Sequence, residues 1–101
     1  MSTKELIQAA KARFNYNLQK NQLSEKYNSK LVFANQGGLW TANSNLISFL
    51  QAFDTSTVVL VDDYQNPILV ERRELLEKAI NLYATVTKQW YEEWKSLENN
   101  R

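Results

Sequence analysis

The sequence is 101 residues long, contains neither cysteine nor histidine, and carries a net charge of only +1. An apolar fraction of 44% excludes a disordered chain, no run of about 18 apolar residues is present to span a membrane, and the lack of cysteine excludes a disulfide scaffold. We expect one domain over residues 1–101, with a compact shape of about 13 Å radius of gyration and about 6,000 Å² of exposed surface.

The first residues are charged and amphipathic and lack the apolar core of a signal peptide. We therefore expect neither secretion nor membrane attachment, and a location in a virion or in the cytoplasm of a host cell. Charge is unevenly spread, since residues 1–50 carry a net +4 and residues 51–101 a net −3.

A first amphipathic helix is predicted from residue 3 to about residue 22. Ser2 and Glu5 have the spacing of a capping box. One apolar face follows at helical spacing and consists of Ile7, Ala10, Phe14 and Leu18. Three asparagines weaken the pattern, so the end is predicted between Lys20 and Asn28.

A short hairpin is predicted next, with strands at residues 30–34 and 39–41. Gly37 and Gly38, the chain's two glycines, lie between them, and glycine permits a tight reversal at positive φ. Asn43 or Ser44 then caps a second helix. Its apolar stripe has the complete spacing i, i+3, i+4, i+7 and is predicted to be core: Leu46, Phe49, Leu50 and Phe53.

A second hairpin and a long helix complete the chain. Residues 57–62 are β-branched and apolar on both faces, which is typical of a well-covered strand, and residues 63–67 form a polar turn before the strand 68–70. The last helix is predicted from Glu71 to Glu98. The expected fold class is therefore α+β, with three helices and two short β-hairpins in the order helix, hairpin, helix, hairpin, long helix.

The sequence contains few of the side-chain types that enzymes use for catalysis. Without histidine or cysteine, the commonest general base, metal ligands and thiol nucleophile are missing, and the paired glycines do not have the spacing of a phosphate-binding loop. Two carboxylate pairs remain. We interpret Asp62 and Asp63 as a solvated turn, and Glu92 and Glu93 as the solvent edge of the last helix. We expect no catalytic residue, metal, cofactor or small-molecule substrate.

Nucleic-acid binding through the first helix is a second hypothesis. Basic residues of the N-terminal third alternate with aromatic ones, and phosphate neutralisation with base stacking uses these types. The spacing of Lys4, Lys11 and Lys20 also suits the polar border of an ordinary amphipathic helix. Since the chain is nearly neutral overall, we expect no nucleic-acid partner.

The last helix carries the candidate interface. Large apolar residues recur at intervals of seven, with Trp94 and Tyr91 beside them, and the candidate interface residues are Leu76, Tyr83, Trp90, Tyr91, Trp94 and Leu97. This stripe can pack on the chain's own sheet or form a protein-protein surface, where Trp and Tyr are enriched. A helix of about 28 residues is roughly 42 Å long and outruns a compact domain. Either a second chain covers its end, or the N-terminal helix folds back over it.

The order of elements from Asn43 to Leu97 is a short helix, a compact hairpin with a polar turn, and a long helix ending in Trp90-Tyr91-Glu92-Glu93-Trp94. This pattern resembles small proteins of tailed bacteriophages, most of all a domain of unknown function found in tail-fibre and tail-fibre-assembly proteins. The chain differs in lacking a Trp in the first strand of the second hairpin. The resemblance implies a virion component or assembly factor that acts through self-association or contacts with other virion proteins. The alternative is a small regulatory protein that binds a host protein or nucleic acid.

Overall fold

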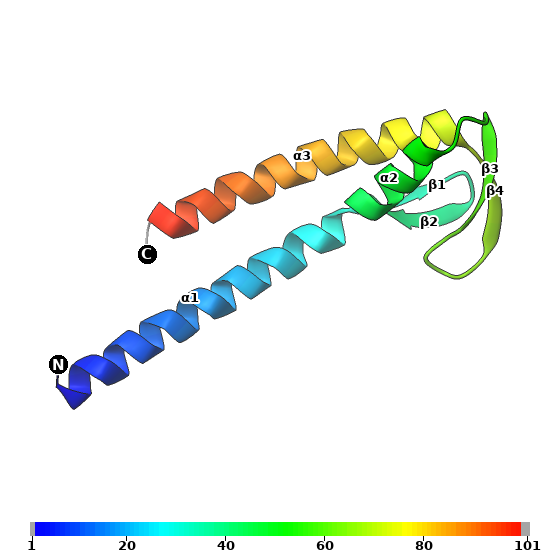
Figure 1. The fold of residues 1–101 in the computed structure, drawn as a ribbon. Helices are drawn as coiled ribbons and strands as arrows, with labels where there is room; N and C mark the ends of the chain where they lie inside the picture. Colours follow the sequence, from blue (N-terminus) through cyan, green and yellow to red (C-terminus); the bar gives the residue numbers. More distant parts are fainter. Residues whose placement is uncertain (1, 100–101) are drawn as a thin grey trace.

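The computed structural model describes residues 2–99, and within them the chain forms three helices and two antiparallel two-stranded hairpins (Figure 1). The elements are α1 (Thr3–Lys30), β1 (Val32–Asn35), β2 (Gly38–Thr41), α2 (Ser44–Ala52), β3 (Thr57–Val61), β4 (Pro67–Glu71) and α3 (Arg72–Asn99). This order confirms the predicted α+β class with its helix, hairpin, helix, hairpin, long helix arrangement.

Helix α1 begins at the predicted capping box and continues beyond its predicted end. The Ser2 hydroxyl accepts a hydrogen bond from the Glu5 N–H at 3.2 Å, and the Ser2 N–H donates to the Glu5 carboxylate at 3.4 Å. The helix reaches Lys30 because its last turns carry Leu23 and Tyr27, which pack into the core. Tertiary packing therefore overrides the weak helix propensity of the asparagines.

The first hairpin turns at Gln36 and Gly37, which have φ angles of 53° and 82°. Two successive left-handed residues define the two-residue turn that matches the twist of a hairpin. Gly38 is needed for a different reason, because a Cβ atom there would lie 2.6 Å from Cζ2 of Trp40. The predicted reversal thus uses one glycine for conformation and the other for space.

The second hairpin pairs β3 with β4 and places Val58 opposite Val70 and Val59 opposite Leu69. Leu60 and Val70 point into the core, whereas Val59 and Leu69 on the other face are 60% and 66% exposed. The prediction of a covered strand was therefore wrong for one face. A two-stranded sheet has one side for its own helices, and among residues 2–99 no element covers the other side.

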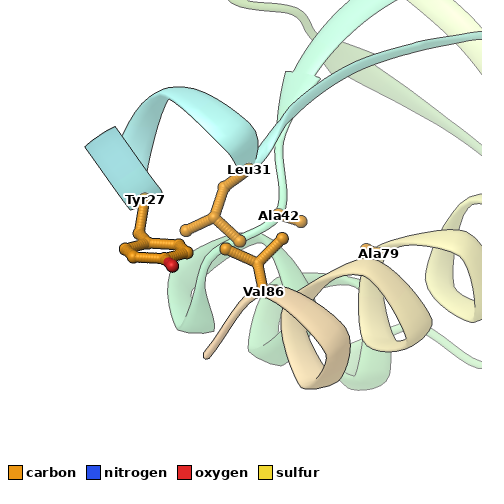
Figure 2. Close-up of a cluster of buried hydrophobic side chains, with 5 residues drawn as sticks. All are labelled: Tyr27, Leu31, Ala42, Ala79 and Val86. Atoms are coloured by element: carbon orange, nitrogen blue, oxygen red, sulfur yellow. The ribbon is translucent and has the colours of Figure 1, made fainter. Parts of the chain in front are cut away.

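Two groups of buried side chains make up the core. The first, where the end of α1 meets α3, consists of Tyr27, Leu31, Ala42, Ala79 and Val86 (Figure 2). The second lies between the hairpins, α2 and α3 and consists of Trp40, Leu50, Leu60, Val70 and Leu75.

The predicted core stripe of α2 was wrong at one position. Leu50 is fully buried and Leu46 and Phe53 are half-buried, but Phe49 is 52% exposed. A helix of nine residues that contacts its neighbours along one line buries only the middle of a stripe with i, i+3, i+4, i+7 spacing, and Phe49 lies at its edge.

The molecule is elongated, with extents of 65 × 25 × 20 Å and a radius of gyration of 19.2 Å. The expectation of a compact shape with a radius of gyration of about 13 Å was therefore wrong. Both hairpins and α2 form a head, residues 31–71, at one end, and α1 and α3 run antiparallel away from it (Figure 1). We call α1 together with residues 86–99 of α3 the stalk.

Candidate protein-protein interface

The candidate interface residues all lie on α3, but the buried line of this helix is displaced from them by about one residue. Leu75, Ala79 and Val86 are buried against α1, α2 and the head. The predicted heptad passes beside this line. Leu76, Trp90, Trp94 and Leu97 are half-buried, whereas Tyr83 and Tyr91 are exposed.

The apolar surface of α3 is therefore broader than one core line requires. At about 100° per residue, Ile80, Tyr83, Tyr91 and Trp94 fall on one side, centred about 100° from the buried line. Three of the four side chains are exposed, and Tyr91 is 57% exposed with its ring tilted against Trp94 at 6.1 Å. We call these four residues the aromatic stripe.

Helix α1 folds back onto part of the distal half of α3, as one of the two predicted arrangements requires. The rings of Tyr27 and Trp90 are stacked, with centroids 6.1 Å apart and planes 9° apart. Next to them the Tyr27 hydroxyl donates to the Glu93 carboxylate, which also accepts from Lys26 Nζ at 2.7 Å. Nearer the tip, the Tyr16 hydroxyl donates to Glu98. Trp90 is thus packed within its own chain.

The contact between the stalk helices favours the charged forms of Lys26 and Glu93. The hydrogen bond from Lys26, followed by that from Tyr27, lowers the pKa of Glu93. The same bond raises the pKa of Lys26, and the bond to Glu93 together with burial raises the pKa of Tyr27. Glu92 and Glu93 are both exposed as predicted, but Glu93 also connects the two stalk helices.

Beyond these contacts the stalk helices enclose an open groove of about 600 Å³. Its lining is mixed in polarity and consists of Ala12, Asn15, Tyr16, Gln19, Glu93, Ser96 and Leu97. The groove belongs to the side of α1 that faces α3. The two titratable side chains in the lining, Tyr16 and Glu93, each hydrogen-bond to a residue of the other stalk helix.

The opposite side of α1 carries the apolar face predicted from the sequence. Ile7, Phe14 and Leu18 lie about 180° around the helix from Tyr16, Leu23 and Tyr27. The structure exposes 51% of Ile7 and 65% of Phe14, and Leu18 is also exposed. We call Ile7, Phe14 and Leu18 the outer stripe; the packing of α1 onto α3 leaves it uncovered.

Asp62 and Asp63, the other carboxylate pair, serve different purposes. Asp62 is only 3% exposed, so the prediction of a solvated turn was wrong for this residue. Its two carboxylate oxygens accept backbone N–H bonds from Leu39 at 3.0 Å, Asn66 at 2.9 Å and Tyr64 at 3.1 Å. These bonds, led by those from Leu39 and Asn66, lower the pKa of Asp62.

Asp63 is exposed as predicted, and its carboxylate accepts from the Thr41 hydroxyl at 2.7 Å. Together the two aspartates connect the turn of the second hairpin to strand β2 of the first. Within residues 2–99, no group of three or more acidic side chains is placed to hold a metal ion.

Sequence reasoning missed the residues of α1 that contact α3. Tyr16, Leu23 and Tyr27 have the spacing i, i+7, i+11, which is a second helical stripe, and it was overlooked because the stripe through Phe14 was more regular. Both stripes are present, on opposite sides of one helix.

A small α+β head carrying a two-helix stalk is the class that the fold defines. None of the described helices combines the length and apolar character needed to cross a membrane. Comparison with family models, curated proteins and solved structures finds no match to this chain.

Proposed function

We propose that the chain works without catalysis, as a structural or assembly protein that associates with itself through the stalk. The setting suggested by the order of its elements is a tailed-bacteriophage virion or the host cytoplasm in which one is assembled. Contacts with other virion proteins would extend the same role.

The total accessible surface that a single copy leaves in water supports this proposal most strongly. The chain exposes 7316 Å², about 1,300 Å² more than the roughly 6,000 Å² typical of its mass. A standard interface buries about 800 Å² on each partner. The surplus is therefore large enough for a stable contact with a second copy.

The aromatic stripe is the surface proposed for that contact. Tyr and Trp are enriched at interfaces, and Tyr83, Tyr91 and Trp94 are spread over about three turns of α3. The same stripe on two copies can meet about a two-fold axis, as in most homodimers. Trp90 would contribute indirectly, by holding α1 against α3 through Tyr27.

Light scattering at micromolar concentration tests the proposal, with an expected mass of a multiple of 11.8 kDa. Ile80→Glu combined with Tyr91→Glu should remove the contact through this stripe and lower the measured mass, because both side chains are exposed and their replacement leaves the core intact. The control combines Asn81→Glu with Thr85→Glu, which adds the same charge on the polar side of α3. A monomeric wild type, or an equal effect of the control, would refute self-association through this stripe.

Nucleic-acid regulation is the weaker candidate. Lys4 and Lys11 lie about 180° around α1 from Arg13 and Lys20, and Lys26 is already paired with Glu93, so not all the basic residues of α1 can contact one phosphate backbone. A gel shift with DNA that disappears as salt rises would favour this role over the one proposed.

A further inference from the structure

Charge is divided between helix α1 and the head. Helix α1 carries six Lys or Arg and two Glu, a net +4. The head, residues 31–71, carries three Asp, one Glu and no basic residue, a net −4. The N-terminal half of α1 and the β3–β4 hairpin lie at opposite ends of the 65 Å long axis (Figure 1).

Each charged end also presents exposed apolar side chains. On α1 these form the outer stripe, with Phe14 its most exposed member. On the head, a groove of about 460 Å³ lies between α2 and β3 and is lined largely by apolar residues. Its lining includes Trp40, Leu46, Phe49, Val59 and Val61. Phe49, Val59 and Val61 are each more than half exposed.

We propose that the head groove of one copy binds the outer stripe of α1 from another copy, with Phe14 inserted between α2 and β3. An amphipathic helix that lays its apolar face in a groove is a common mode of recognition. Here the helix is basic, and the exposed acidic residues of the head are Asp54, Asp63 and Glu71. The lining of the groove is largely apolar, like the outer stripe, and the helix and the head carry opposite net charges.

Other pairings satisfy these surfaces less well. A single chain does not close the contact on itself in this structure, because α1 is one continuous helix that extends away from the head. Pairing the outer stripes of two α1 helices would bring together Lys4 and Lys11, which border the stripe on both copies, and like charges repel. A second copy's head is the partner that supplies the opposite charge.

The proposed contact is heterologous, since it joins two different surfaces of the same chain. Such contacts generate open chains of subunits unless the rotation closes a ring. The inference shares with the proposed function the idea that the partner is a second copy, but it uses residues separate from the aromatic stripe. The two contacts can therefore be tested apart.

The test uses the Ile80→Glu/Tyr91→Glu background, in which the aromatic stripe is disabled. Light scattering should still show a mass that grows with concentration and falls as salt rises from about 0.1 M to about 1 M, where the Debye length shrinks from about 10 Å to about 3 Å. A monomer at every concentration would overturn the head-to-tail contact, whether or not the wild type dimerises through the aromatic stripe.

Two further variants in that background identify the surfaces. Phe14→Glu disables the helix and Val59→Glu disables the groove, and each alone should be monomeric with an unchanged circular-dichroism melt. Mixed in equal amounts they should form a complex of two chains, because one intact groove meets one intact helix. Gln8→Glu and Gln51→Glu serve as controls, each adding one carboxylate outside the surfaces. Loss of assembly with Phe14→Glu but not with Val59→Glu, or no complex in the mixture, would refute the pairing.

Discussion

Two adjacent residues of α2 offer a sharp test of how the head is packed. Leu50 is fully buried among Trp40, Leu60, Val70 and Leu75, whereas Phe49 is 52% exposed. Leu50→Ala should therefore destabilise the protein more than Phe49→Ala, even though the second change removes more atoms.

The magnitudes follow from burial. Truncating a buried leucine costs about 2–5 kcal/mol, which corresponds to a Tm fall of at least about 10 °C in a domain of this size. For Phe49, about half of the roughly 1.5–3 kcal/mol of full burial is at stake. Its edge-to-face contact with Phe53, at 5.0 Å, adds about 0.5–1.5 kcal/mol. We expect a total of about 1–3 kcal/mol for Phe49→Ala, against about 2–5 kcal/mol for Leu50→Ala.

Urea unfolding followed by circular dichroism measures both values, at low protein concentration so that association does not add to stability. Lysine at the two positions widens the contrast. Leu50→Lys should unfold the protein because it buries a charge, while Phe49→Lys should cost no more than Phe49→Ala, since the lysine stem covers the same surface. Equal losses at both positions would show that α2 is rotated relative to the head.

Two other predictions concern the contacts that join the hairpins. Because the pKa of Asp62 is lowered in the folded state, the stability that this carboxylate contributes is complete above the ordinary carboxyl pKa of about 4 and is lost as pH falls from there through the lowered value. Asp62→Asn should therefore be less stable than the wild type at pH 7, and its Tm should fall less steeply as the solution is acidified. An equally steep acid fall of Tm in the variant would contradict this role of Asp62. Gly38→Ala should lower the free energy of unfolding, measured in urea, by about 1–3 kcal/mol, because the new Cβ would lie 2.7 Å from Ile68 Cδ1 and also against Trp40. An unchanged free energy of unfolding would mean that the indole of Trp40 moves aside freely.

The features that were predictable from sequence are those set by neighbouring residues. The capping box of Ser2 and Glu5, the turn at Gly37 and the cap at Asn43 depend on side chains within four positions of the backbone they contact. The order of elements follows from such signals.

What was missed depends on residues far apart in the chain. The burial of Asp62 requires Leu39, 23 residues away, to donate its N–H, and no local pattern distinguishes this from an ordinary turn aspartate. The apolar face of α3 is so wide that two neighbouring lines of residues along it both have helical spacing. The larger residues Tyr83 and Trp90 suggested the core line, whereas the buried line passes through Ala79, whose small side chain belongs to the same buried group as Ala42 and Val86.

The N-terminal part of α1, which precedes the Tyr16–Glu98 contact, should be less stable than the part of the same helix near Tyr27. Amide protons near Tyr27 should exchange only when the core opens, whereas those between Thr3 and Phe14 rely on the marginal stability of a short helix in water. Hydrogen exchange in a monomeric variant should therefore accelerate steadily toward the N-terminus. In the assembled protein the same amides would become protected, so α1 would act as an internal reporter of how many copies are joined.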